Sequence, residues 1–156
     1  MKLSEIVQPD RIAVPLPSPD KQTAVFGLAD LLLKHTDITD GDALKQAIWA
    51  RETTRTTGIG HGIAIPHGKC AGVGRLYMAI GRCATPVDFA SIDGKPVELI
   101  ILLASPVDQT GPHIQALAKV SRLLTDADFR DRVKAVETPS DLYDMIVAQE
   151  LAQATV

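Results

Sequence analysis

The sequence predicts an α/β fold in which helices flank a mixed β-sheet, in a single domain over residues 1–156. A chain of 156 residues is near the size at which one hydrophobic core can bury roughly two thirds of the unfolded surface. The aliphatic run Val97–Ala104 is typical of a strand covered on both faces. Stretches with the spacing of amphipathic helices lie before and after it, and this alternation favours a layered α/β domain.

The amino-terminal part predicts an extended arm followed by a helix. Residues 1–17 place scattered apolar side chains between prolines, which is more typical of an extended segment packed on the domain than of a helix. Ser18 as N-cap and Pro19 at the first helical position indicate a helix start. Apolar residues at helical spacing continue this helix to about His35.

A second helix is expected before a glycine-rich segment. Thr39 or Asp40 can cap this helix, and its apolar positions end near Thr53. The β-branched and glycine residues that follow indicate a loop that enters a short strand, Ile63–Ile65. We expect this strand to deliver His67 at its carboxyl end.

The second half of the chain alternates strand and helix patterns. Arg75–Cys83 has the alternation of a half-buried strand, and Asp93–Gly94 is a turn signal before the aliphatic run. From Pro112 the spacing becomes helical. The inward face predicted for this helix is Ile114, Leu117, Ala118, Ser121 and Leu124. Two further helices complete the chain, a short one over Asp126–Ala135 and a last one opened by the capping-box-like Thr138–Asp141.

Composition argues against several classes of partner. The net charge is -3, with 16 Lys and Arg against 19 Asp and Glu, and no basic run is present, so we expect no nucleic-acid partner. Cys70 and Cys83 have no metal or redox spacing. The amino terminus has no signal-peptide pattern, and the longest apolar run is too short to span a bilayer. We therefore expect a cytoplasmic protein with no direct membrane insertion.

The stretch Gly58–Gly68 contains the strongest functional signal. Its histidine, His67, carries an imidazole with an ordinary pKa near ~6.5, which is largely neutral at pH 7 and can attack phosphorus or a carbonyl, or bind a metal. Pro66 restricts the backbone that holds the ring. Glycines around it can let backbone N–H groups approach an anion closely: Gly58, Gly60, Gly62 and Gly68. A phosphoryl group is the natural ligand for such a site.

Two other residues can contact the same anion. Arg51 lies near the end of the second helix, where its guanidinium can bind phosphate oxygens in a bidentate manner. His113, near a helix N-terminus, can donate a hydrogen bond where the helix dipole already favours negative charge. Each residue also has a structural interpretation: His67 as a packed histidine, Arg51 as a solvated helix-end charge, and His113 as a surface residue of the first helical turn. The residues alone leave these alternatives open.

Other chemistries lack their motifs. The sequence has no GxSxG nucleophile elbow, no HxxxH or HExxH zinc spacing and no GxxxxGK[ST] phosphate loop. We therefore expect neither a metal nor a cofactor. Histidine phosphorylation remains as the chemistry that fits the glycine-framed His67.

The segment Thr57–Lys69 resembles the active-site signature of the enzyme IIA proteins of the bacterial phosphotransferase system, fructose/mannitol type. The resemblance extends along nearly the whole chain and includes Arg51 with its neighbour Glu52. It implies the enzyme IIA fold and a phosphoryl group accepted on Nε2 of His67 from a histidine phosphocarrier protein. It also implies that Arg51 and His113 surround the phosphate. His61 stands where relatives usually have Asn or an acid, and would add a titrating group beside the phosphate.

Within this family, the residues of the signature are most similar to those of the nitrogen-regulatory enzyme IIA. This resemblance implies regulatory target proteins as partners. A sugar-specific enzyme IIA is the alternative; it would pass the phosphoryl group to a cysteine of an enzyme IIB during sugar uptake. A second alternative is a protein-binding module in which the histidine has no catalytic use.

Overall fold

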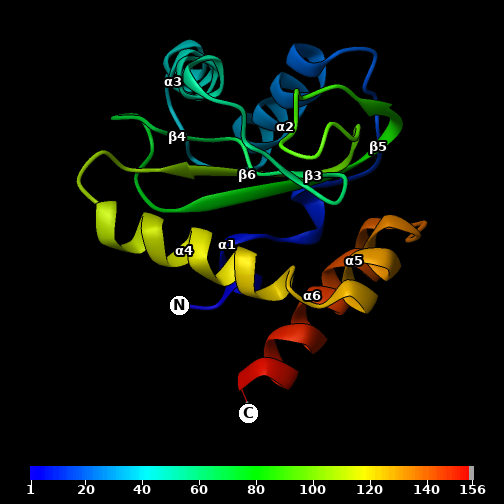
Figure 1. The fold of residues 1–156 in the computed structure, drawn as a ribbon. Coiled ribbons are helices and arrows are strands. Elements are labelled where there is room, and N and C mark those ends of the chain that lie inside the picture. Colours follow the sequence, from blue (N-terminus) through cyan, green and yellow to red (C-terminus); the bar gives the residue numbers. More distant parts are fainter. Residues whose placement is uncertain (155–156) are drawn as a thin grey trace.

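A six-stranded mixed sheet runs through the middle of the molecule, with helices on both faces (Figure 1). The computed structural model describes residues 1–154. The strand order is β1-β5-β6-β3-β2, and β4 also pairs with β6. The strands are β1 (Ile12–Leu16), β2 (Gly58–Gly60), β3 (Ile63–Ala64), β4 (His67–Lys69), β5 (Tyr77–Val87) and β6 (Val97–Ser105).

The aliphatic run predicted as the central strand is β6, which is buried at every position except Glu98. It pairs antiparallel with β5, and Met78 lies opposite Leu103. The predicted strand at residues 75–83 is therefore confirmed, although β5 continues to Val87, which pairs with Val97. Because β6 has neighbours on both edges and helices on both faces, a continuous apolar sequence is the one that can be buried there.

Helices form one layer on each face of the sheet. In Figure 1, α2 and α3 lie on one side, and α4, α5 and α6 on the other. The helices are α1 (Leu3–Ile6), α2 (Lys21–His35), α3 (Gly41–Thr54), α4 (Thr110–Leu123), α5 (Ala127–Lys134) and α6 (Pro139–Ala154), with a 3-10 turn at Pro9–Arg11. Alternate residues of β6 serve the two layers: Ile100 packs with α2 and α3, and Ile101 packs with α4 to α6.

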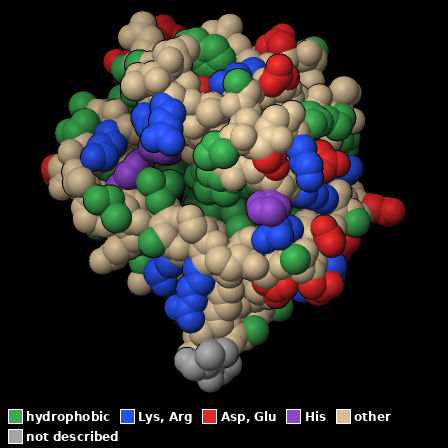
Figure 2. Space-filling view, viewed as in Figure 1, with side chains coloured by type: hydrophobic (Ala, Val, Ile, Leu, Met, Phe, Trp, Pro, Cys, Tyr) green, Lys and Arg blue, Asp and Glu red, His purple; other side chains and the backbone are tan. Residues whose placement is uncertain are grey.

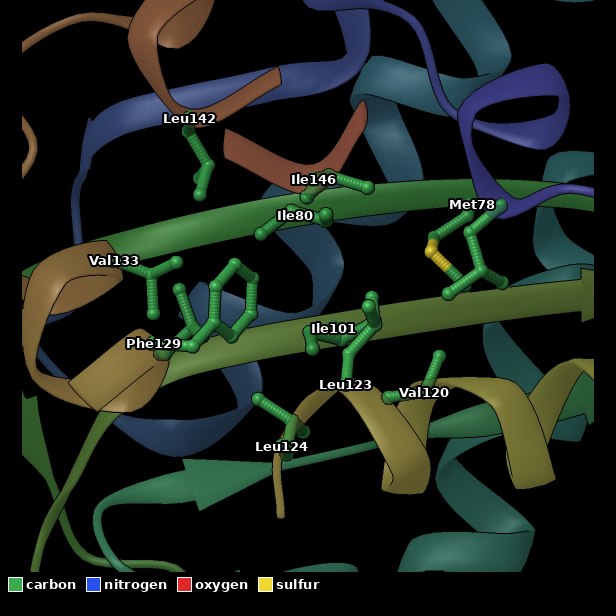
Figure 3. A pocket seen from close by; sticks show the side chains of 12 residues that line it. Met78, Ile80, Ile101, Val120, Leu123, Leu124, Phe129, Val133, Leu142 and Ile146 are labelled. Carbon is green, nitrogen blue, oxygen red and sulfur yellow. The ribbon is translucent and has the colours of Figure 1, made fainter. Parts of the chain in front are cut away.

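The layer of α4, α5 and α6 encloses a wholly apolar space against the sheet. Figure 3 shows side chains from β5, β6 and these helices pointing into it, including Phe129 of α5 and Ile146 of α6. The cavity left between these side chains is only about 20 Å³, so the core is filled close to the density of ordinary protein interiors. No helix among residues 1–154 is long and apolar enough to cross a membrane.

The amino-terminal prediction was wrong in part. Residues 1–17 form α1, the 3-10 turn and β1, and β1 pairs parallel with β5 as the edge strand of the sheet. The N-cap of α2 is Asp20, whose carboxylate accepts a hydrogen bond from Thr23 N at 2.7 Å. Ser18 is instead buried, and its hydroxyl donates to Thr85 O at 2.6 Å. The carboxylate of Asp20, two residues closer to the helix than Ser18, is the cap instead.

Three other predicted helix starts are confirmed. Asp40 caps α3 by accepting from Ala43 N at 3.1 Å, and Asp126 caps α5. Thr138 accepts from Asp141 N at 3.1 Å at the start of α6. In each case a short polar side chain satisfies a backbone N–H group that the helix leaves without a partner.

The predicted inward face of α4 was wrong in part: Leu124 is buried and Leu117 half-buried as expected, whereas Ile114, Ala118 and Ser121 are exposed. Ile114 is 60% exposed, and the helix begins at Thr110 rather than Pro112. The buried positions are His113, Ala116, Val120 and Leu123. The prediction was based on the aliphatic residues of the helix and therefore selected the stripe next to the buried one. A histidine was not expected to be the first residue of the buried face. His113 is buried because its ring packs against His67 and lies within hydrogen-bond distance of Ser105 in the functional site.

Candidate functional site

His67 lies on β4, a three-residue strand that the sequence did not predict. β3 and β4 both pair parallel with β6, as two parts of one strand interrupted at Ile65 and Pro66. Pro66 has no N–H group to donate to the ladder, which explains the interruption. At this interruption the Ile65 carbonyl accepts a hydrogen bond from Nδ1 of His67 at 2.9 Å.

That hydrogen bond determines which nitrogen of His67 carries the ring proton. A carbonyl oxygen can only accept, so Nδ1 carries the ring proton and Nε2 carries the lone pair. Within residues 1–154, Nε2 has no hydrogen-bond partner. Burial lowers the pKa of His67 below its usual value, and the positive charge of Arg51 lowers it further, more than offsetting the hydrogen bond to Ile65 that raises it. The ring is thus neutral at neutral pH, with the Nε2 lone pair available.

His113 of α4 packs against His67, as the prediction required. The two ring centroids are 5.3 Å apart with an interplanar angle of 61°. His113 is not the surface residue of the alternative interpretation, since it is only 4% exposed. Its Nδ1 lies 2.6 Å from the hydroxyl of Ser105, the last residue of β6. Burial, with smaller contributions from the charges of His67 and Lys69, lowers the pKa of His113 to about 4.

Arg51 lies in the last turn of α3 and shares a surface hollow with His67. Its Nη1 donates to the Arg55 carbonyl at 2.8 Å, which ties the guanidinium to the loop after the helix. Arg55 itself lines the same hollow. The three residues predicted as the site, His67, Arg51 and His113, therefore converge on one region from β4, α3 and α4.

The hollow beside His67 also has apolar walls. Its aliphatic lining is Ile59, Ile65, Ile92 and Leu117. Ile59 is 42% exposed and Ile92 is 76% exposed, so part of this lining faces solvent. Figure 2 shows the corresponding pattern on one face of the molecule, where hydrophobic side chains line a depression next to histidine, lysine and arginine.

Sequence reasoning did not identify Lys69 or Glu52 as parts of the site. Lys69 lies on β4 two residues after His67, so it shares the same face of the strand, and its Nζ donates to Thr110 Oγ1 at 3.1 Å. Glu52 is 2% exposed and accepts from both the backbone N–H and the hydroxyl of Thr57. Lys21 neutralises the Glu52 carboxylate at 3.0 Å. Glu52 therefore anchors the loop that carries Arg55 into the hollow.

The predicted rim of glycine N–H groups is wrong for most of the glycines. Gly60 and Gly62 have φ values of 97° and 76° and form the turn between β2 and β3, away from the hollow. Gly68 is required by packing, because a Cβ there would lie 2.9 Å from Ile48 N of α3. Only Gly58 lines the hollow with His67, and its N–H donates to Thr56 Oγ1 at 3.1 Å.

His61 does not lie beside His67, which corrects the expectation of a second titrating group at the phosphate. It occupies the turn between β2 and β3 with φ 58°, and its N–H donates to Asp93 Oδ2 at 2.9 Å. Its carbonyl accepts from Lys134 of α5. His61 lines a separate polar depression with Lys95 and other residues; Figure 2 shows histidine at two separated places on this face.

Within residues 1–154 no three His, Cys, Asp or Glu side chains are grouped so that they could hold a metal ion. Among residues 1–154, the cations near His67 are Arg51, Arg55 and Lys69, and the one carboxylate that acts on its ring, Glu52, is paired with Lys21. This arrangement favours an anion next to the free Nε2 lone pair.

Residues 5–149 match the family described as "Phosphoenolpyruvate-dependent sugar phosphotransferase system, EIIA 2". The chain belongs to this family. It is 33% identical over 147 residues to a nitrogen regulatory protein of Pseudomonas aeruginosa, an alignment that covers 94% of this chain and 96% of that protein. It is 34% identical over 146 residues to the PTS system fructose-specific EIIABC component of Bacillus subtilis, covering 94% of this chain but only 23% of that protein.

Solved structures confirm the EIIA fold. The nitrogen regulatory protein IIA-Ntr from Neisseria meningitidis superposes with a TM-score of 0.84 at 29% identity, covering 92% of this chain and 98% of that chain. IIA mannitol from Escherichia coli superposes with a TM-score of 0.76 at 20% identity, covering 89% of this chain and 97% of that chain. The second likeness concerns the fold alone. The predicted family and its mixed sheet flanked by helices are therefore confirmed.

Proposed function

We propose that this EIIA chain is a phosphoryl carrier in which Nε2 of His67 accepts a phosphoryl group from a histidine phosphocarrier protein. The observation that carries the proposal is the hydrogen bond from Nδ1 of His67 to the Ile65 carbonyl, at 2.9 Å. It holds the ring in the tautomer whose lone pair is on Nε2, on a strand that contacts α3 and pairs with β6. A nucleophile held in one tautomer and one orientation loses little entropy on reaction.

The transfer requires no metal and no cofactor. The Nε2 lone pair forms a bond to phosphorus as the donor's nitrogen–phosphorus bond breaks, and the electron pair of that bond returns to the donor imidazole. The phosphoryl oxygens keep their negative charge throughout, so positioning and charge stabilisation are what the protein must supply. Arg51 and Lys69 supply positive charge beside His67, and His113 supplies a neutral ring adjacent to it.

Phosphorylation of His67 would also act as a signal that partner proteins can detect. A phosphohistidine changes the local charge by roughly two units, next to exposed apolar side chains such as Ile59 and Ile92. A partner that packs on this apolar rim would bind one charge state better than the other. We propose regulatory target proteins as these partners, because the nitrogen regulatory protein of Pseudomonas aeruginosa aligns over nearly its whole length. We place this activity in the cytoplasm, where Cys70 and Cys83, both free and buried, stay reduced.

Intact-mass measurement tests the phosphoryl-carrier proposal. The full chain is incubated with phosphoenolpyruvate, enzyme I and a histidine phosphocarrier protein. Wild type should gain one phosphoryl group, and the His67→Ala variant none. His61→Asn is the matched control, since it removes a histidine outside the site and asparagine tolerates the left-handed backbone at φ 58°; it should be phosphorylated like wild type. A His67→Ala variant that still gains the phosphoryl group, or a wild type that gains none, would overturn the proposal.

A sugar-specific role is the second candidate, favoured by the 34% identity to the fructose-specific EIIABC component. It predicts rapid onward transfer to the cysteine of a purified enzyme IIB. The regulatory role predicts that the phosphoryl group stays on His67 when enzyme IIB is added. Radiolabelled phosphate followed on both proteins distinguishes the two roles.

A further inference from the structure

Ser105 interrupts an otherwise apolar pattern at the point where β6 meets α4. From Leu99 onward, every second residue of β6 faces the layer of α4 to α6, and the first three of these are aliphatic: Leu99, Ile101 and Leu103. The next in this series is Ser105, which is 0% exposed. The buried stripe of α4 begins in the same way with a polar residue, His113, before Ala116 and Val120. The two polar side chains therefore meet at one end of an apolar interface.

The contact between them determines where the His113 ring carries its proton. Ser105 Oγ and His113 Nδ1 are 2.6 Å apart, and either group can be the donor in such a pair. The Ser105 hydroxyl has no other hydrogen-bond partner among residues 1–154. If the ring donated, the hydroxyl proton would be buried without an acceptor, which costs about 1–3 kcal/mol. If the hydroxyl donates, both groups are satisfied, and the ring proton is on Nε2.

We propose that Ser105 is a positioning residue that holds His113 as its Nε2–H tautomer, so that His113 donates a hydrogen bond to the phosphoryl group carried by His67. The proposal rests on the phosphoryl-carrier function proposed for His67. The two neighbouring imidazoles then have complementary tautomers. The Ile65 carbonyl places the proton of His67 on Nδ1, and the Ser105 hydroxyl places that of His113 on Nε2.

Complementary tautomers match the needs of the reaction. His67 must present a lone pair to phosphorus, whereas a neighbour of the phosphoryl oxygens must present a proton to them. In the opposite tautomer His113 would present a lone pair to oxygens that are also rich in lone pairs. The pKa of His113, lowered to about 4 by burial, means that the ring has a single proton at neutral pH. Its location on Nε2 or Nδ1 therefore decides whether His113 assists.

The direct test is the tautomeric state of both rings in the unphosphorylated full chain. Long-range ¹H–¹⁵N correlation spectra of ¹⁵N-labelled protein at pH 7.5 distinguish protonated from unprotonated ring nitrogens. Wild type should show His113 protonated on Nε2 and His67 protonated on Nδ1. In Ser105→Ala the His113 signals should move to the averaged positions of two exchanging tautomers, and those of His67 should stay. An Nδ1-protonated His113 in wild type, or an unchanged tautomer in Ser105→Ala, would overturn the proposal.

Phosphorylation kinetics test whether the tautomer is used. Ser105→Ala should slow phosphorylation of His67 by about tenfold, because the donor is loosened but not removed. Ser105→Thr keeps the hydroxyl and should restore most of the rate, and Ser140→Ala, an exposed serine at the start of α6, should match wild type. A wild-type rate in a folded Ser105→Ala variant would overturn the positioning role. Failure of wild type to accept any phosphoryl group would instead refute the carrier function, while the spectra would still report the tautomer.

Discussion

The interface between β6 and α4 has an apolar end and a polar end, built on the same strand and the same helix. At the apolar end Ile101 packs with Val120 and Phe129 around a cavity of about 20 Å³ (Figure 3). At the polar end Ser105 and His113 occupy equivalent inward positions and hydrogen-bond at 2.6 Å. The regular spacing of strand and helix continues through both ends, and only the residue types change.

The apolar end contributes mainly to the stability of the fold, and the polar end contributes mainly to the chemistry of the site. The apolar end gains free energy from every buried side chain. At the polar end two groups lose their hydration and recover about one hydrogen bond, so their burial contributes little net stability. What the polar end provides, on our proposal, is a histidine held in one tautomer next to His67. Variants at the two ends should therefore affect different observables.

The largest expected effect on stability is at the apolar end. Phe129 is 2% exposed, and Phe129→Ala should lower the free energy of unfolding by about 3–5 kcal/mol because it removes buried surface and leaves a cavity. Urea denaturation measures the loss. Under conditions in which Phe129→Ala is folded, it should still be phosphorylated on His67. A loss below about 1 kcal/mol, or a folded variant that accepts no phosphoryl group, would contradict the separation of the two ends.

The polar end should govern the pH dependence of stability. The folded pKa of His113 is about 4, below an unfolded value near ~6.5, and the pKa of His67 is also lowered. The unfolded chain therefore binds more protons below about pH 6.5, so stability is fully present above that pH and is lost as the pH falls toward 4. His113→Gln should reduce the difference in unfolding free energy between pH 7.5 and pH 5.

Urea denaturation at the two pH values checks this prediction. His61→Asn is the matched control, since it removes an exposed histidine from the turn between β2 and β3. It should keep the wild-type pH dependence. If His113→Gln loses as much stability on acidification as wild type does, the burial of a neutral His113 is not the cause.

The smallest effect is expected for a charge-conserving change outside the interface. Arg51→Lys should leave the fold and its stability unchanged but slow phosphorylation by about three- to tenfold, because the charge remains and the planar fork is lost. Stopped reactions analysed by intact mass give the rate. Phosphorylation at the wild-type rate would show that the fork is dispensable.

The fold was predictable from the sequence because its signals are local and repeated. The aliphatic run of β6 is enough to predict a buried strand. The short polar caps at Asp40 and Asp126 are enough to predict where α3 and α5 begin. β4 was missed because three residues that include a glycine, His67–Lys69, have no strand pattern of their own. They are extended because they continue β3 beyond Pro66 along the edge of β6, which is a property of the sheet rather than of the segment.

In the site, the residue types were predictable but their partners were not. His67, Arg51 and His113 stood out by chemistry, and the structure brings them together. Ser105 and Glu52 did not stand out, because a serine at a strand end and a glutamate in a helix are ordinary until their burial is known. The burial of His113 was hidden for the same reason. A polar residue in an inward position, such as Ser105 after three aliphatic ones, was the available signal.

The nitrogen that carries the phosphoryl group tests the central claim most directly. The full chain labelled with ¹⁵N-histidine is phosphorylated by its carrier and examined by ³¹P and ¹⁵N NMR. The hydrogen bond from Nδ1 to Ile65 predicts a single phosphohistidine, with phosphorus bonded to Nε2 of His67. Phosphorus on Nδ1 of His67, or on any other histidine, would contradict the account.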